Sequence, residues 1–184
     1  MKLSQSLYNI LKGQEESEEP SNTGFSLEKW QELGKNGVPI PMKIPLHGSS
    51  MVPLIRSEKD MVTVMPLVRE PMVGDIVLFC RADGKKIVHR VYRVFPDGVQ
   101  TWGDNCQRAD APIKREAIYG IIVSMEKDGK TYQLDTEKQR AYGIRWMRYG
   151  RPAWMTMKKI KAIGRMVIRT VFPDTHKDHN SVQE

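Results

Sequence analysis

Only two cysteines occur among the 184 residues, and no stretch of the chain stays apolar long enough to span a bilayer. Cys80 and Cys106 are too few for a disulfide framework and lack the spacing of metal ligands, which indicates ordinary thiols in a reduced compartment. The alternative is a single disulfide bond between Cys80 and Cys106. A spanning helix needs about 20 consecutive apolar residues. The first 20 residues also lack the apolar core and cleavage site of a secretory signal. We therefore expect a cytoplasmic protein, at most peripheral on the inner face of the membrane.

Acidic residues are absent from positions 138–173, a window that holds ten Lys and Arg residues in a chain of net charge +7. Such a block favours an acidic partner, either a lipid surface or a nucleic acid. Within 142–170, Trp, Met and Ile alternate with the basic residues, which is typical of a helix on an anionic membrane surface. The competing interpretation is a helix that packs its apolar stripe on the domain and keeps a solvated basic face. Pro152 predicts two helical pieces. An anionic membrane surface is the favoured partner of this segment, ahead of nucleic acid.

The middle of the chain has the pattern of a β-rich domain. Prolines make residues 38–46 extended, an edge strand at best, because a residue before proline is pushed out of the helical region. Valine-rich runs separated by turn residues follow, and the dipeptides at 97–98 and 128–129, both Asp-Gly, are strong hairpin signals. Several short strands at this interval predict a small β-barrel or folded β-sheet domain. The predicted strands are 61–65, 76–80, 86–95, 99–102, 118–125 and 131–134.

Helical patterns flank this domain. Residues 1–13 show helical spacing, residues 14–24 are polar and acidic like a linker, and Ser26 is placed to cap a short helix over 27–33. The predicted fold class is mainly β, with helical N- and C-terminal extensions. We expect a helical, acidic extension over 1–36, a β-rich domain over 37–136, and a basic helical segment with a polar tail over 137–184.

Three polar sites lie at strand ends or turns of the predicted domain: Ser50, His89 and the pair Asp104/Asp110. A serine hydroxyl is a weak nucleophile near neutral pH and needs a base within hydrogen-bond reach. His89 lies inside the β-rich segment and titrates near neutral pH without strong desolvation. A lysine as the general base is the weaker alternative, because Lys85 and Lys86 follow a turn and should be solvated.

Four short segments add specificity to this candidate set. Residues 48–54, Gly-Ser-Ser-Met-Val-Pro-Leu, resemble the Ser-Met-x-Pro box of type I signal peptidases, and residues 74–79 look like the family's Gly-Asp-hydrophobic strand. Residues 88–91, Val-His-Arg-Val, match the box of the branch that uses histidine instead of lysine, which includes the endoplasmic-reticulum and archaeal enzymes. Gly-Asp-Asn at 103–105 followed by Asp110 resembles that branch's Gly-Asp-Asn…Asp segment. The order of the four segments is that of the family.

The resemblance covers roughly residues 44–123 and implies a serine peptidase with the folded β-sheet of signal peptidases and LexA-like proteins. It implies Ser50 as nucleophile and His89 as the base that takes its proton. Asp110 would hold the imidazole and stabilise its charged form. Asp104 is the competing carboxylate, although the glycine beside it favours a turn-forming role.

The resemblance also suggests how the tetrahedral oxyanion and the substrate are bound. The backbone N–H of Ser50 is the first expected oxyanion donor, and Ser49 is a candidate for the second, because Gly48 stands where some relatives have a serine. We expect Met51 to pack beside the site and Pro53 to start the following turn. The implied partner is a peptide or protein whose leader or pro-segment is cut after a small residue. No metal or organic cofactor is implied.

The chain departs from most relatives because it lacks their membrane-spanning anchor, which puts the removal of secretory signal peptides in doubt. Two rival hypotheses follow. One is a self-cleaving regulatory peptidase of the phage-repressor type, although residues 1–36 are short and acidic for a DNA-binding helix-turn-helix. The other is a non-enzymatic β-module that binds nucleic acid or membrane through its basic tail, and nucleic-acid binding of that kind would fall steeply with salt.

Overall fold

The computed structural model describes residues 26–171. The helix expected over 1–13 and the linker expected over 14–24 lie outside this range. The cap at Ser26 is confirmed, because its hydroxyl accepts a hydrogen bond from the Lys29 N–H at the start of helix α2 (Leu27–Lys35). The helix extends two residues past the predicted end at 33.

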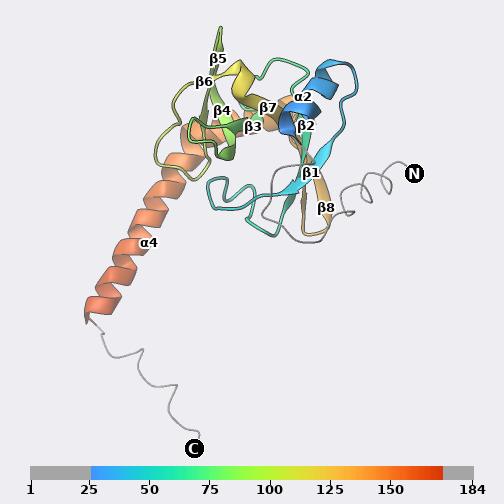
Figure 1. The fold of residues 1–184 in the computed structure, drawn as a ribbon. Helices are drawn as coiled ribbons and strands as arrows, with labels where there is room; N and C mark the ends of the chain where they lie inside the picture. The colour runs from blue at the N-terminus through green and yellow to red at the C-terminus, as the bar shows by residue number, and fades with distance from the viewer. Residues whose placement is uncertain (1–25, 172–184) are drawn as a thin grey trace, which may run out of the picture.

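Eight antiparallel strands form one curled sheet, so the mainly β fold class is confirmed (Figure 1). The strand order is β1-β2-β7-β3-β4-β5-β6, with β8 paired to β7. Their bounds are β1 Met42–Pro45, β2 Met61–Pro66, β3 Ile76–Cys80, β4 Lys86–Phe95, β5 Gly98–Trp102, β6 Ile113–Lys114, β7 Ile118–Lys127 and β8 Lys130–Gln133.

The sheet order places strands that are distant in the sequence next to one another. β1 is an edge strand, as its prolines predicted, and β7 lies between β2 and β3 although it comes late in the chain. The turn between β7 and β8 has positive φ at both Asp128 and Gly129, as an Asp-Gly hairpin requires. β3 and β4 have the predicted bounds, and their pairing places Val77 opposite His89.

Two apolar clusters stabilise the sheet, one on each side. Phe79, Val91 and Ile121 belong to the cluster on the side of His89. The other cluster contains Leu78 and Met51, so the turn after β1 is fixed to the sheet by burial. Its further members include Trp30, Ile55, Val62, Val64, Val88, Tyr119 and Ile122.

The C-terminal part consists of α3 (Glu137–Arg145), a π-helical turn over Trp146–Gly150 and α4 (Arg151–Val171). These segments follow one another with no non-helical residue between them, so the expected division of the helix at Pro152 is wrong. Pro152 lies in the first turn of α4, where a proline is tolerated. In Figure 1, α4 extends away from the sheet. The helices of the described residues include none that is both long and apolar enough to cross a membrane.

Candidate active site

Ser50 lies in the turn that follows edge strand β1. Gly48, two residues earlier, has φ of +89°, a conformation that favours glycine and would strain a serine. This geometry explains why a glycine occupies the position. Downstream, the buried Asp60 carboxylate accepts hydrogen bonds from the backbone and the guanidinium of Arg56, which closes the turn after the nucleophile candidate.

His89 lies on β4 and its ring is almost fully buried. Its Nδ1 is 2.6 Å from Oδ2 of Asp110, a carboxylate that reaches the strand from the loop after β5. The same Oδ2 accepts a hydrogen bond of 2.7 Å from Thr101, and the Asp110 N–H donates to the Thr101 carbonyl. Because its carboxylate is fixed from two sides, Asp110 fixes the orientation of the imidazole. Nε2 then faces the first residues of the same loop, Gly103 and Cys106.

Asp104 has a different partner. Both of its carboxylate oxygens accept hydrogen bonds from Arg90, at 2.9 and 2.8 Å, and both side chains are buried. Arg90 also donates to the Gly74 carbonyl. Asp104 therefore lies in a turn, as expected, but its carboxylate binds Arg90. Residues 89 and 90 are neighbours on a strand, so their side chains leave on opposite faces and take different carboxylates.

Gly103 brings the histidine and the Ser50 turn close together. A Cβ added there would lie 2.8 Å from Nε2 of His89 and 2.9 Å from the carbonyl oxygen of Ser50. That carbonyl accepts a hydrogen bond of 2.7 Å from the Asn105 N–H, and the Asn105 side chain donates to the Ser49 carbonyl. The loop after β5 therefore ties the serine turn to the strand that carries the imidazole.

The Cys106 thiol lies 3.9 Å from Nε2 of His89. Burial of the imidazole acts to lower its pKa, but the hydrogen bonds and charges of Asp110 and Cys106 outweigh burial and raise the pKa to about 9. For Asp110, burial acts to raise the pKa, and the hydrogen bonds from His89 and Thr101 more than offset it, so that its pKa is lowered. The pair is therefore an imidazolium and a carboxylate at neutral pH.

The hydroxyl and the backbone N–H of Ser50 differ from its carbonyl, which is bonded to Asn105. Among residues 26–171, neither of these two groups makes a hydrogen bond, so Ser50 is not hydrogen-bonded to His89. Hydrogen bonds of catalytic groups are often long or absent before substrate binds. An unpaired N–H at the nucleophile is a donor available to an oxyanion.

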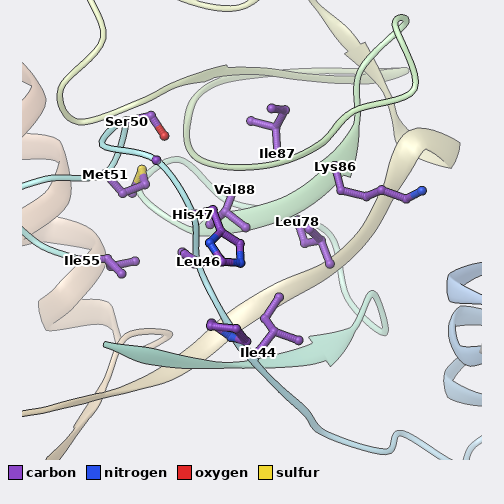
Figure 2. Close-up of a pocket in the computed structure, with 12 residues that line it drawn as sticks. Ile44, Leu46, His47, Ser50, Met51, Ile55, Leu78, Lys86, Ile87 and Val88 are labelled. Atoms are coloured by element: carbon purple, nitrogen blue, oxygen red, sulfur yellow. The ribbon is translucent and has the colours of Figure 1, made fainter. Parts of the chain in front are cut away.

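Ser50 also borders a cavity of about 230 Å³ (Figure 2). The cavity lies between the end of β1 and the start of β4, and its walls are mainly apolar, formed in part by Ile44, Leu46, Leu78 and Val88. In Figure 2, Ser50 and Lys86 lie on different sides of this cavity. An edge strand beside an apolar cavity can bind an extended peptide by backbone pairing and side-chain insertion.

The remaining predicted positions lie around this centre. Met51 is buried in the core, as expected, and the exposed Pro53 lies in the turn after it. Ser49 is exposed and contributes its carbonyl to Asn105, so nothing in its contacts favours an oxyanion role. His47 is largely exposed and 3.5 Å from Glu58, which fits a surface histidine.

The other titratable groups give no second site. Lys85 is solvated, with 71% of its side chain exposed, and lies near Asp83. Cys80 and Cys106 are free thiols, so the alternative of a bridge is wrong. No group of three or more His, Cys, Asp or Glu side chains suited to a metal ion occurs in the described part of the chain.

Sequence reasoning missed the residues that hold the loop after β5. The carbonyl of Cys106 accepts hydrogen bonds from Arg151 and from the Trp102 indole, and the Arg151 guanidinium stacks 3.6 Å from the centre of the Trp102 ring. Asn105 accepts from Trp154 of α4. The sequence could have identified Asn105, because it lies within the Gly-Asp-Asn segment at 103–105. It gave no indication of Arg151, which lies 45 positions after Cys106.

Comparison with known proteins does not identify a family: neither the protein-family models nor the curated protein sequences give a match to the chain.

Proposed function

We propose that the protein is a serine endopeptidase of the signal-peptidase type, which removes a leader or pro-segment from a peptide or protein. The observation that carries the proposal is the 2.6 Å contact between His89 and Asp110, with the other imidazole nitrogen directed at Gly103 and the carbonyl of Ser50 beyond it. A base oriented by a carboxylate and directed toward a serine turn is the arrangement that nucleophilic catalysis needs.

In the proposed reaction, neutral His89 takes the hydroxyl proton of Ser50 while Oγ attacks the scissile carbonyl carbon. The oxyanion accepts a hydrogen bond from the unpaired Ser50 N–H. As the C–N bond breaks, the imidazolium gives its proton to the leaving amine. Water then attacks the acyl-enzyme, His89 takes a proton from the water, and that proton returns to Ser50. Asp110 keeps the imidazole oriented and stabilises its charged form throughout.

The cavity beside Ser50 supports a peptide as substrate. Its volume of about 230 Å³ and its apolar walls suit small or medium side chains of an extended chain, in line with the small residue that the resemblance implies before the cut. Edge strand β1 has one side unpaired in the sheet, and its backbone is available to such a chain.

Cys106 is a second candidate for the nucleophile, because its sulfur is 3.9 Å from Nε2 and Ser50 is not bonded to the ring. A thiol beside an imidazole and a carboxylate is the arrangement of cysteine peptidases. Of the two nucleophile candidates only Ser50 lines the cavity; Cys106, like His89, does not.

The test is cleavage of a mixture of synthetic precursor-like peptides with small residues at varied positions, with products identified by mass spectrometry. Wild type and Cys106→Ala should cut, and Ser50→Ala and His89→Ala should not. Equal cleavage by wild type and Ser50→Ala would overturn Ser50, and loss of cleavage in Cys106→Ala with retention in Ser50→Ala would assign the thiol. Protein incubated without peptide controls for self-cleavage.

A further inference from the structure

The two sides of α4 have opposite environments. Residues three or four apart share a face of a helix, and the face formed by Arg151, Trp154 and Lys158 contacts the domain. Trp154 and Lys158 both donate to the side-chain oxygen of Asn105, at 3.1 and 2.9 Å, and Arg151 is buried. The contact with the domain is therefore made by the polar, basic face of the helix.

The apolar face of α4 points away from the domain. Met157, Ile160 and Ile163 are 48%, 63% and 61% exposed. The interpretation that the apolar stripe packs on the domain is thus wrong for this part of α4, where the apolar side chains and the basic ones beside them are both exposed. Scattered exposed apolar residues are normal, but a row of them along one helix face indicates a binding surface.

Positive charge borders this apolar row. Lys159, Lys161 and Arg165 are exposed, and none of them forms an ion pair with another residue of the described range 26–171. No Asp or Glu occurs anywhere from 138 to 173. A surface that is apolar along its centre and basic at its margins is complementary to an anionic lipid interface.

This charge distribution also separates the candidate occupants. A second copy of the chain would bring the same positive margins to the contact, and like charges oppose that pairing. A nucleic acid would use the charges but has no need of an apolar row. Of these three occupants, only an anionic bilayer surface uses both features.

We infer that α4 binds flat on an anionic lipid membrane, with the row formed by Met157, Ile160 and Ile163 inserted among the headgroups. Because α4 is hydrogen-bonded to Asn105, and Asn105 to the carbonyl of Ser50, the bound helix would hold the Ser50 turn on the side of α4 that faces away from the bilayer. The inference stands on the helix alone and does not depend on the proposed peptidase activity.

The test is co-sedimentation of the full chain with vesicles of phosphatidylcholine alone and of phosphatidylcholine mixed with phosphatidylserine. Binding to the mixed vesicles should be at least about 10-fold tighter, since several basic residues contribute to it. It should weaken as salt is added. Equal binding to both vesicle types, or no binding to either, would overturn the inference.

Two variants with the same charge change separate the apolar row from general electrostatics. Ile160→Asp adds a negative charge on the exposed apolar face and should weaken vesicle binding at least about 10-fold. Ala162→Asp adds the same charge four positions after Lys158, on the basic face, and should weaken it only a few-fold. Both positions are exposed, so both variants should fold like wild type, with circular dichroism as the check.

The same variants also test the other candidate occupants of the apolar face of α4. Equal losses in Ile160→Asp and Ala162→Asp would contradict insertion of the apolar row. Sedimentation without vesicles reports self-association, and a dimer that Ile160→Asp disperses would assign the face to a second copy instead. Ser50→Ala should bind vesicles like wild type, so a failed peptidase assay and a failed membrane assay are independent results.

Discussion

The two faces of β4 carry two ion pairs built from neighbouring residues, and they have opposite chemical properties. On one face Arg90 and Asp104 have side chains 4% and 1% exposed and share two hydrogen bonds. On the other face His89 and Asp110 share one contact, and the second imidazole nitrogen stays available toward the Ser50 turn. Both carboxylates come from the loop that follows β5.

The difference lies in the cation. A guanidinium does not lose its proton in a protein, so the Arg90–Asp104 pair is fixed and joins the loop to the sheet. An imidazole gains and loses a proton near physiological pH, so the His89–Asp110 pair can take part in proton transfer. We expect substitutions in the Arg90–Asp104 pair to change the free energy of unfolding. Substitutions in the His89–Asp110 pair should change the rate of cleavage.

Asp110→Asn should have the largest effect on activity. Asparagine keeps the shape and the hydrogen bond from Thr101 but cannot stabilise an imidazolium, and loss of the carboxylate costs about 10⁴-fold in a serine peptidase triad. The free energy of unfolding should fall by about 1 kcal/mol. Peptide cleavage rates and urea denaturation measure the two quantities. A variant with wild-type activity would remove Asp110 from the mechanism.

Asp104→Asn should give the complementary result. It leaves the buried charge of Arg90 without a counter-ion, and breaking a buried pair in this way costs about 3–5 kcal/mol. Urea denaturation should show this loss, while the protein that remains folded should cleave at a rate within a few-fold of wild type. If instead stability is unchanged and cleavage falls as far as in Asp110→Asn, the two carboxylates have been assigned to the wrong roles.

The strands were predictable because their signals are local. Turn residues such as those at 97–98 and 128–129 separate valine-rich runs, and β3 and β4 were found with their observed bounds. β6 was missed, since two residues beside a proline give no alternation to detect. The sheet order was not predictable, because pairing of β7 between β2 and β3 depends on contacts between distant segments.

The candidate site was predictable as a set of residue types but not as a set of pairs. Asp104 and Asp110 both lie in an irregular loop, where no periodicity tells which face of β4 each one reaches. The pairing of Arg90 with Asp104 had no local signal, since the two residues lie 14 positions apart in the chain. The resemblance favoured Asp110 as the partner of His89, and the geometry places it there.

A glycine packs against each cation of β4, which gives a matched pair of substitutions. A Cβ on Gly103 would press on Nε2 of His89 and on the backbone of Ser50, so Gly103→Ala should lower cleavage about 10- to 100-fold by displacing the reacting groups. A Cβ on Gly143 of α3 would lie 2.8 Å from Cζ of Arg90. Gly143→Ala should therefore lower the free energy of unfolding by about 1–3 kcal/mol.

The loss of stability predicted for Gly143→Ala is opposite in sign to the usual effect of this substitution in a helix. In the interior of a helix, alanine normally stabilises by about 1 kcal/mol relative to glycine. A loss of stability would show that the space above Arg90 is required, whereas a gain would mean that α3 can shift away from the sheet at little cost. Cleavage by this variant should stay near that of wild type, in contrast to Gly103→Ala.

The smallest effect of a substitution on activity is expected for Cys106→Ala, and it concerns the pH profile. With the pKa of His89 raised to about 9, the imidazole of the free protein is protonated at pH 7 and cannot act as a base, so kcat/KM should rise about 50-fold from pH 7 to pH 9. Cys106 is one cause of the raised pKa. Cys106→Ala should therefore lower the pKa, move this rise to lower pH and increase cleavage at pH 7 a few-fold. If the thiol has a purely structural role, Cys106→Ala will leave the pH profile unchanged. If the thiol is the nucleophile, Cys106→Ala will abolish cleavage at every pH.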